Sequence, residues 1–266
     1  MHPVGKGMRL AILSVVIWGL SLTAQAEESA KPMDLDSLRA CMAANLPAQS
    51  LFQEVRLVAR DAAGARELQA RVYGMKLNEE VAVMIDVRAP ADMSGSRYLV
   101  VSGQDSDAMY LYLPALNRTR RVVGSMAGQS LWGTEFSYED VKLLRGLMTH
   151  GEVSMEHVQW QQRPAHRLLV RPQSTDQSAY TLVKLTVDAA TCVVVAASFE
   201  DEAGAVKSME VPLEDLVQVD EHWWARRVIV NSQRRNASSE LIVDDYSFDP
   251  ELRARLFDPR TFHQGR

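Results

Sequence analysis

The amino-acid sequence predicts a mainly β protein whose strands form one large antiparallel sheet. After position 50, short segments rich in β-branched and aromatic residues recur at close intervals, and turn-type sequences such as DAAG (61–64) and DEAG (201–204) separate them. Such a succession of strands is typical of an antiparallel meander. About a dozen strands in one sheet leave open edges and a bare face, so we expect the sheet to curl into a barrel or to fold over as a sandwich.

The first 26 residues are expected to be a signal peptide rather than part of this fold. Lys6 and Arg9 form a basic start, an apolar run follows over 10–22, and small residues precede a cleavage site after Ala26. The apolar run is shorter than the roughly 20 residues of a membrane span, although an uncleaved N-terminal anchor is the alternative. We expect residues 27–266 to be exported as a single soluble domain.

The charge of the chain argues against a nucleic-acid partner. The full chain carries a net charge of −5, and loss of the two basic residues of the leader lowers this to −7. Nucleic-acid binding requires a basic surface. No hydrophobic run after the leader approaches the length of a membrane span.

One helix is expected ahead of the strands, over 33–47. An aspartate at 34 or 36 can cap it, and Pro47 ends it. Its apolar residues recur at helical spacing. They are Leu35, Leu38, Met42 and Leu46.

The two cysteines, Cys41 and Cys192, are expected to form one disulfide, because an even count in an exported protein favours pairing. The bond would fix the N-terminal helix to the strands. Two buried free thiols are the alternative. The spacing fits neither a redox motif nor a zinc site.

Two of the expected strands, 109–113 and the start of 192–201, carry little charge on either face. A strand that is apolar on both faces must be covered on both sides, for example by a barrel interior and by a helix or loop. The expected strands are 51–60, 67–77, 80–90, 96–102, 109–113, 152–160, 165–172, 180–188, 192–201, 205–213, 223–233 and 238–248.

The search for catalytic or metal-binding groups is unproductive. The histidines lack metal-ligand spacing, although His157 and His166 can face each other across the turn at 161–164. There is no nucleophile elbow, phosphate-binding loop or dinucleotide fingerprint. We therefore expect no enzyme activity, no catalytic residue, no metal and no cofactor.

The segment after strand 109–113 is the most informative. Three glycines, at 124, 128 and 133, space a loop that holds apolar side chains, and a helix is expected over 136–146. Ser137 and Asp140 have the spacing of a capping box. The loop either plugs the core or forms a lid over an apolar cavity.

Basic and aromatic residues suggest further contacts. Arg118, Arg120 and Arg121 form either a solvated turn, paired with acidic residues at 135–140, or a basic rim for lipid headgroups or an acidic partner. Trp223 and Trp224 alternate along a strand, so at most one is expected to reach a cavity.

The two motifs YLYLPALNRTRRV (110–122) and WGTEFSYEDV (132–141) resemble the pattern YLPAL-x-R-x-RRI … GS-x-F-(S/T)-YED. That pattern is found in outer-membrane lipoprotein-sorting-like (LolA-like) periplasmic proteins, in the branch associated with RND-type lipid exporters. A DAATCV … GAVK hairpin at 188–207 agrees in layout. The departures are Met109 and Tyr110 where a tryptophan is common, and WGTEF where GSDF is usual.

The resemblance implies a half-open antiparallel β-barrel of about 11 strands with a few lid helices. It also implies an apolar cavity for acyl chains, with 109–113 as a barrel strand, 114–136 as a loop closing over the cavity and 137–145 as a lid helix. The candidate lipid-binding and lid residues are then Tyr110, Leu111, Tyr112, Leu113, Met126, Leu131, Trp132 and Phe136.

By the same resemblance, the expected function is a periplasmic carrier of lipid or lipoprotein acyl chains. Its expected partners are an inner-membrane RND-type exporter and an outer-membrane acceptor, and the three arginines are the candidate headgroup or partner rim. The alternative is a lipid-sensing regulatory protein that binds a membrane signalling partner. A chain of this length leaves little room for the extra interaction domain that such a sensor would need.

Overall fold

The structure is a computed structural model that describes residues 33–46, 48–77, 80–102, 107–123, 126–141, 151–173 and 178–264. Residues 34–266 form one compact unit. The expected signal peptide and its cleavage site lie outside the described residues. No described helix is long and apolar enough to cross a membrane.

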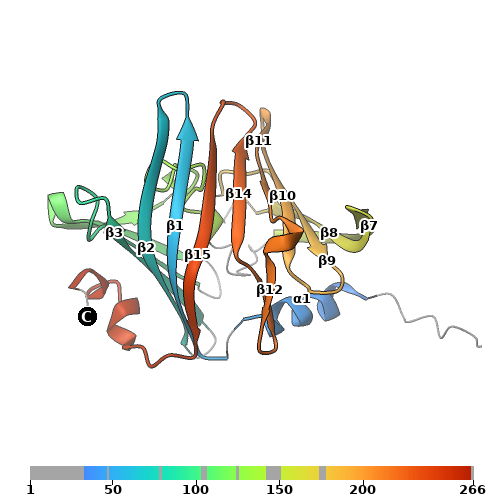
Figure 1. Ribbon diagram of the computed structural model, residues 1–266, viewed down its shortest axis with the longest axis horizontal. Coiled ribbons are helices and arrows are strands. Elements are labelled where there is room, and N and C mark those ends of the chain that lie inside the picture. Colours follow the sequence, from blue (N-terminus) through green and yellow to red (C-terminus); the bar gives the residue numbers. More distant parts are fainter. Residues whose placement is uncertain are drawn as a thin grey trace, which may run out of the picture. The chain divides into compact units, whose positions relative to one another are not determined.

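The fold is mainly β, as predicted, and most of its strands belong to one antiparallel sheet (Figure 1). The described part of this sheet contains 13 strands in the order β6-β5-β4-β3-β2-β1-β15-β14-β11-β10-β9-β8-β7. They are β1 (Ser50–Asp61), β2 (Gly64–Leu77), β3 (Glu80–Ala89), β4 (Arg97–Val101), β5 (Ala108–Leu113), β6 (Arg118–Val122), β7 (Gly151–Trp160), β8 (Arg163–Pro172), β9 (Leu182–Asp188), β10 (Val194–Asp201), β11 (Gly204–Glu210), β14 (Arg227–Ser232) and β15 (Ser238–Phe248).

Shorter elements complete the described chain. The strands β12 (Leu216–Val219) and β13 (His222–Ala225) form a separate two-stranded hairpin. The helices are α1 (Leu35–Ala44) and the short 3₁₀ turns η1 (Pro114–Leu116), η4 (Leu213–Asp215), η5 (Ala254–Phe257) and η6 (Phe262–Gln264).

The strand count exceeds the expected number of about 11 for three reasons, the first being that β12 was not among the expected strands. The arginine-rich segment that we expected to be a loop pairs with β5 as strand β6, because an edge strand can leave its charged side chains in solvent. The expected strand 223–233 is divided at Arg226, whose N–H donates to the carbonyl oxygen of Asp215 at 2.8 Å. This hydrogen bond turns the chain from the β12–β13 hairpin into the main sheet.

The sheet does not close, because β6 and β7 lie at its two ends and do not pair with each other within the described residues. These two strands are nevertheless consecutive along the chain. The segment between them must therefore run from one edge of the sheet to the other. Residues 126–141, the described part of this crossover, are called the crossover loop below.

The two faces of the sheet are distinguished by the residues that pair directly across neighbouring strands. On the face called inner, Val72 of β2 lies opposite Ile85 of β3, and Ile85 lies opposite Tyr98 of β4, which lies opposite Leu111 of β5. Tyr110 and Tyr112 of β5 point to the outer face.

The outer face of β2 to β5 is covered by the C-terminal segment. Leu256, Phe257 and Phe262 pack with Tyr73, Met84 and Leu99, and Tyr110 and Tyr112 lie against the same cluster. The Arg97 guanidinium donates to the carbonyl oxygen of His263, which ties the end of the segment to β4. Strand 109–113 is therefore apolar on both sides because protein covers both, as the sequence predicted.

Helix α1 confirms the predicted N-terminal helix, with slightly tighter bounds. Asp34 caps it by accepting a hydrogen bond from the Ser37 N–H at 2.8 Å, and Leu38 is fully buried. The helix ends with Asn45 as its C-cap, close to the β12–β13 hairpin (Figure 1). The Asn45 amide donates to the Thr191 carbonyl at 2.7 Å and accepts from the Trp223 N–H at 2.9 Å.

The predicted disulfide between Cys41 and Cys192 is present, with a Cα–Cα distance of 5.8 Å across a sequence separation of 151 residues. It joins the middle of α1 to the turn between β9 and β10. Together with the hydrogen bonds of Asn45, it fixes the helix at one end of the sheet.

Replacement of both cysteines by serine should lower the free energy of unfolding by about 3 kcal/mol, because the unfolded chain is no longer constrained by a loop of this length. Urea unfolding with and without a reductant measures the effect. Reductant should destabilise the wild type and leave the double variant unchanged. Equal stability of the oxidised wild type and the double variant would contradict the prediction.

Candidate functional site

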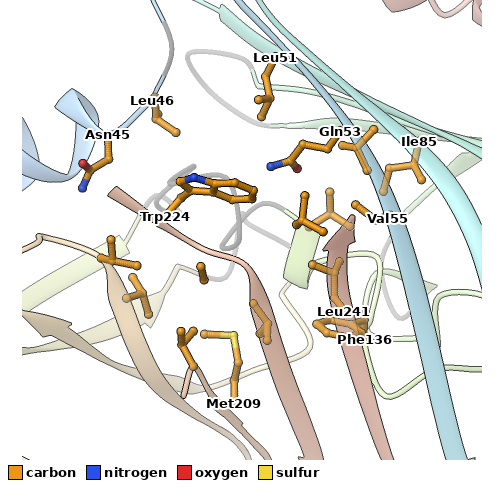
Figure 2. A pocket seen from close by; sticks show the side chains of 18 of the residues that line it. Asn45, Leu46, Leu51, Gln53, Val55, Ile85, Phe136, Met209, Trp224 and Leu241 are labelled. Atoms are coloured by element: carbon orange, nitrogen blue, oxygen red, sulfur yellow. The ribbon is translucent and has the colours of Figure 1, made fainter. Parts of the chain in front are cut away.

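An apolar cavity of about 190 Å³ lies on the inner face of the sheet. Leu51, Val55 and Leu57 of β1 form one wall, and strands on either side of β1 complete it (Figure 2). The further strand residues that line the cavity are Gln53, Val72, Ile85, Val194, Met209, Val228, Leu241, Val243 and Phe248. Hydrophobic side chains thus surround a space into which strands from both halves of the sheet point.

The β12–β13 hairpin covers the cavity on one side. The Trp224 ring packs edge-on against Tyr246 with 4.7 Å between centroids, and His222 packs in the same way against Phe248 at 5.1 Å. In Figure 2 the Trp224 indole extends over the cavity from this hairpin. Trp223 lines the cavity as well. The two side chains alternate along β13, so the expectation that at most one of them points into a cavity stays a prediction.

Helix α1 and the crossover loop supply the rest of the cover. Met42 and Leu46 line the cavity from the helix side. Leu131, Trp132 and Phe136 line it from the loop side, and the side chains of Leu131 and Phe136 are almost fully buried. The loop therefore both fills core volume and covers the cavity, so the two interpretations of the sequence hold together.

The turn that presents these loop residues is closed by its own backbone. The Leu131 N–H donates to the Phe136 carbonyl at 2.7 Å. Trp132 and Gly133 have φ values of 52° and 76°, in the left-handed region that favours glycine. At Trp132 this conformation is strained, and such strain collects where a side chain must be held in one place.

The glycine at 128 serves a different purpose, which is close packing. A methyl group added there would lie 2.3 Å from the Cβ of Ala179, well inside contact distance. The crossover loop consequently rests directly on the chain that leads into β9. Gly124 lies outside the described residues.

The far end of the crossover loop is held by a buried ion pair between Asp140 and Lys207 of β11. Their side chains are 5% and 6% exposed. Asp140 also accepts hydrogen bonds from the Tyr180 hydroxyl at 3.1 Å and from the Ser137 N–H at 2.7 Å. The Lys207 ammonium donates to the Glu135 carbonyl at 3.1 Å. Burial, followed by the Asp140 charge, raises the pKa of Tyr180, so the phenol stays protonated.

The predicted capping box is confirmed, because the Asp140 N–H donates to the Ser137 hydroxyl at 3.2 Å while Asp140 accepts from Ser137 in return. A helix begins at Asp140, but the remainder of the expected lid helix over 137–145 lies outside the described residues. Glu139 is buried and accepts from the Ala179 N–H at 3.0 Å and from the Ser178 hydroxyl. We name the contacts of Asp140 and Glu139 with Lys207, Tyr180 and 178–179 the loop anchor.

The eight candidate lipid-contact residues do not gather at one place. Leu131, Trp132 and Phe136 line the cavity. Tyr110 and Tyr112 face the C-terminal segment on the outer side, whereas Leu111 and Leu113 lie on the inner face outside the cavity. Met126 is half-buried and does not line it either. The Tyr98 hydroxyl donates to the Tyr138 carbonyl at 2.9 Å, so the crossover loop covers the inner face beside Leu111.

The three candidate rim arginines are exposed on strand β6. None of them forms an ion pair with the acidic residues at 135–140. Glu135 instead pairs with Arg235 at 2.7 Å, and the other two acids belong to the loop anchor. The suggested pairing is therefore wrong, because those carboxylates meet Arg235 after β14, residues 178–179 and Lys207 of β11 rather than strand β6.

Most residues that line the cavity come from strands that the sequence analysis had identified without assigning them a role. Alternation marks which residues of β1 share a face, and Leu51, Gln53, Val55 and Leu57 follow it. It does not show which part of a long strand is left uncovered. The part of the strand that stays uncovered depends on where α1, the β12–β13 hairpin and the crossover loop pack against the sheet.

Two polar groups in the cavity wall have no partner. The indole N–H groups of Trp132 and Trp224 are buried and lack a hydrogen-bond acceptor within the described chain. A buried donor without an acceptor costs about 1–3 kcal/mol. Each indole N–H could donate one hydrogen bond to a carbonyl or carboxylate oxygen.

Other polar constellations in the structure are small. Among the described residues, no group of three or more His, Cys, Asp or Glu side chains is arranged to hold a metal ion. His157 and His166 do face each other across β7 and β8, with 3.1 Å between their Nδ1 atoms. Burial, and then the neighbouring ring, lower the pKa of His166.

The curved, unclosed antiparallel sheet with an apolar cavity beneath a crossover loop defines a LolA-like fold. A DUF1329 family protein from Desulfovibrio piger has this fold, with 20% identity, a TM-score of 0.74, and coverage of 83% of this chain and 94% of that chain. So does a putative outer-membrane lipoprotein-sorting protein domain from Vibrio parahaemolyticus, with 20% identity, a TM-score of 0.73, and coverage of 85% and 96%.

A LolA superfamily protein from Nitrosomonas europaea is also similar, with 14% identity, a TM-score of 0.66, and coverage of 85% of this chain and 98% of that chain. Residues 79–264, more than half of the chain, match a family model that is described only as "-like: Uncharacterized protein". The chain belongs to the family that this model describes, and its fold is LolA-like, as the motifs within 110–141 indicated. A comparison with curated proteins finds no match.

The Lys207→Met substitution should lower the free energy of unfolding by about 3–5 kcal/mol, because it leaves the buried Asp140 carboxylate without its cation. Urea unfolding measures this loss, and hydrogen exchange should accelerate over residues 126–141. The double variant Asp140→Asn/Lys207→Met should recover part of it.

The matched control for this prediction is Arg234→Met, which breaks the more exposed ion pair with Asp201. It should cost less than about 1 kcal/mol. An equally small loss for Lys207→Met would show that the loop anchor does not hold the loop.

The histidine pair should make stability depend on pH. The pKa of His166 is lowered in the folded protein, so below the unfolded value of about 6.5 the unfolded chain binds a proton at this residue more readily than the folded chain does. The free energy of unfolding therefore falls as the pH drops below that value. The double variant His157→Gln/His166→Gln should show a flatter decline between about pH 7 and 5.5, and His157→Gln alone an intermediate one. Identical slopes in thermal unfolding would contradict this.

Proposed function

We propose that this protein is a periplasmic carrier that shelters the acyl chain of a lipid or lipoprotein and moves it between membranes. The observation that supports this most directly is the apolar cavity on the inner face of an unclosed sheet, covered by a loop that is anchored by a few polar contacts. The proposed donor is an inner-membrane RND-type exporter, and the proposed acceptor lies in the outer membrane. No bond needs to be made or broken.

The chemistry of the cavity suits an acyl chain. Its lining consists of aliphatic and aromatic side chains apart from Asn45, Gln53 and a few backbone groups, and Asn45 is already hydrogen-bonded. Burial of a chain contributes about 0.8 kcal/mol per methylene, or about 12 kcal/mol for sixteen carbons. A protein that carries an acyl chain through water needs a favourable free energy of burial of about this size.

The cavity is small for an acyl chain. Its volume of about 190 Å³ is below the roughly 300–1,000 Å³ of most ligand pockets. A second cavity of about 330 Å³ lies beside it, and Leu46 and Leu51 line both. We infer that movement of these two leucines joins the cavities and lengthens the space available to a chain.

The unpaired indole donors of Trp132 and Trp224 favour a ligand that carries a hydrogen-bond acceptor. An ester, amide or carboxylate oxygen at the end of an acyl chain would satisfy one or both of them. A load with such a group is therefore favoured over a plain hydrocarbon, because only the former removes the cost of the buried donors.

The substitution Leu241→Trp should weaken the binding of a fluorescent fatty acid at least about tenfold, because the larger ring fills the cavity. Fluorescence titration with the purified protein measures this. Leu169→Trp makes the same change on the outer face of β8 and should bind like wild type.

Mass spectrometry of organic extracts of the protein, purified from its host, should recover an acyl lipid from wild type and from Leu169→Trp. Much less should be recovered from Leu241→Trp. Failure to recover lipid from the wild type, together with no titratable binding of the fatty acid, would refute the carrier.

A further inference from the structure

Strand β6 has an unusual surface. Leu116 and Val123 are 56% and 47% exposed, and they are the exposed large hydrophobic side chains of the described chain. They flank β6 at its two ends, since Leu116 lies two residues before the strand and Val123 directly follows it. The exposed strand therefore has an apolar side chain at each end.

Between these two apolar residues lie Arg118, Arg120 and Arg121, all exposed. None of the three forms an ion pair or a side-chain hydrogen bond with a described residue. Several arginines elsewhere on the surface are paired, for example Arg56 with Asp244 at 2.7 Å and Arg234 with Asp201 at 2.6 Å. In a chain with a net charge of −5, strand β6 is thus a local concentration of uncompensated positive charge.

The three arginines do not point the same way. Arg120 lies opposite Leu111, so it is on the inner face, and Arg121 lies opposite Tyr110, so it is on the outer face. A partner laid flat against one face would miss part of this charge. A partner that runs along the edge of the sheet can reach all three guanidinium groups.

Among the described residues, this edge of the sheet is ordered and has no strand paired to it. Strand β6 is the last strand at its end of the described sheet, so one row of its backbone groups lacks a neighbouring strand. The hairpin turns through Pro114 and the left-handed Asn117, whose side chain accepts a hydrogen bond from the Tyr112 hydroxyl at 3.0 Å. An ordered edge of this kind accepts an added strand.

We propose that strand β6 docks an extended acidic segment of a partner protein by strand addition. Carboxylates on the two faces of the added strand meet Arg120 on one side and Arg121 on the other, and its ends pack against Leu116 and Val123. The positive edge also repels the same edge of a second copy, which selects against self-pairing. The docking goes beyond the carrier function and needs no load in the cavity.

The probe for this proposal is the capped peptide TEVEEVET, which has glutamates on both faces when extended. It should bind the full chain, and the amides of 118–122 should become protected from hydrogen exchange. Affinity should fall about tenfold or more in Arg118→Gln/Arg120→Gln/Arg121→Gln, and with added salt. The peptide with glutamine in place of glutamate, and the peptide N-methylated along its backbone, should both bind much more weakly.

The matched control is Arg39→Gln/Arg171→Gln/Arg260→Gln, which removes the same charge from other exposed positions and should bind the peptide like wild type. Equal peptide affinity of the two triple variants would overturn the proposal. The proposal would also be overturned if the protein bound phosphatidylglycerol vesicles through the three β6 arginines and did not bind the peptide. The partner would then be a membrane surface.

A fatty-acid titration of the β6 variant separates this proposal from the carrier function. Unchanged fatty-acid binding with lost peptide binding is the expected result. Lost binding of both the peptide and the fatty acid would indicate that the three substitutions disturb the fold. The single variant Arg121→Gln, on the outer face away from the crossover loop, must then still weaken peptide binding for the proposal to stand.

Discussion

The structure depends on one constraint, which is that a large unclosed sheet must be covered wherever its faces are apolar, on the inner face and on the outer face of β2 to β5. The outer face of β2 to β5 is covered by the C-terminal segment through Leu256, Phe257 and Phe262. The inner face is covered by elements from three distant parts of the sequence, namely α1, the crossover loop and the β12–β13 hairpin. A cavity remains where these three covers meet, so the candidate site is a consequence of how the sheet is covered.

The covers are attached in different ways. Helix α1 is joined covalently through Cys41, whereas the crossover loop is held by the buried pair of Asp140 and Lys207 and by hydrogen bonds of Glu139. A buried ion pair contributes little net stability compared with apolar packing, but it fixes one geometry. Separation of the two charges breaks the whole contact at once. The loop side of the cavity is accordingly the side that can move without disrupting strand pairing.

The sequence was sufficient to predict the class of fold, because alternation and turn residues depend on local structure. It also predicted the bridge between Cys41 and Cys192 and the capping box at Ser137. The position of the cavity was not predictable in the same way, since Met209 or Leu241 looks like any other inward residue of a strand. Strand β6 was missed for a related reason, because three arginines resemble a turn unless the strand is known to be an edge.

The resemblance located the crossover loop correctly but gave it the wrong extent. It assigned all of 114–136 to the loop, although 118–122 pairs with β5. It also grouped Tyr110 with Leu111, whose side chains lie on opposite faces. Whether those residues contact lipid stays a prediction, and direct binding measurements have to decide it.

The disulfide has a consequence for the order of assembly. Cys41 lies near the start of the chain and Cys192 lies 151 residues later, beyond most of the strands. Helix α1 therefore acquires its covalent attachment only after the chain has extended through β9. A chain interrupted before residue 192 would lack this attachment, and α1 would then depend on noncovalent contacts alone.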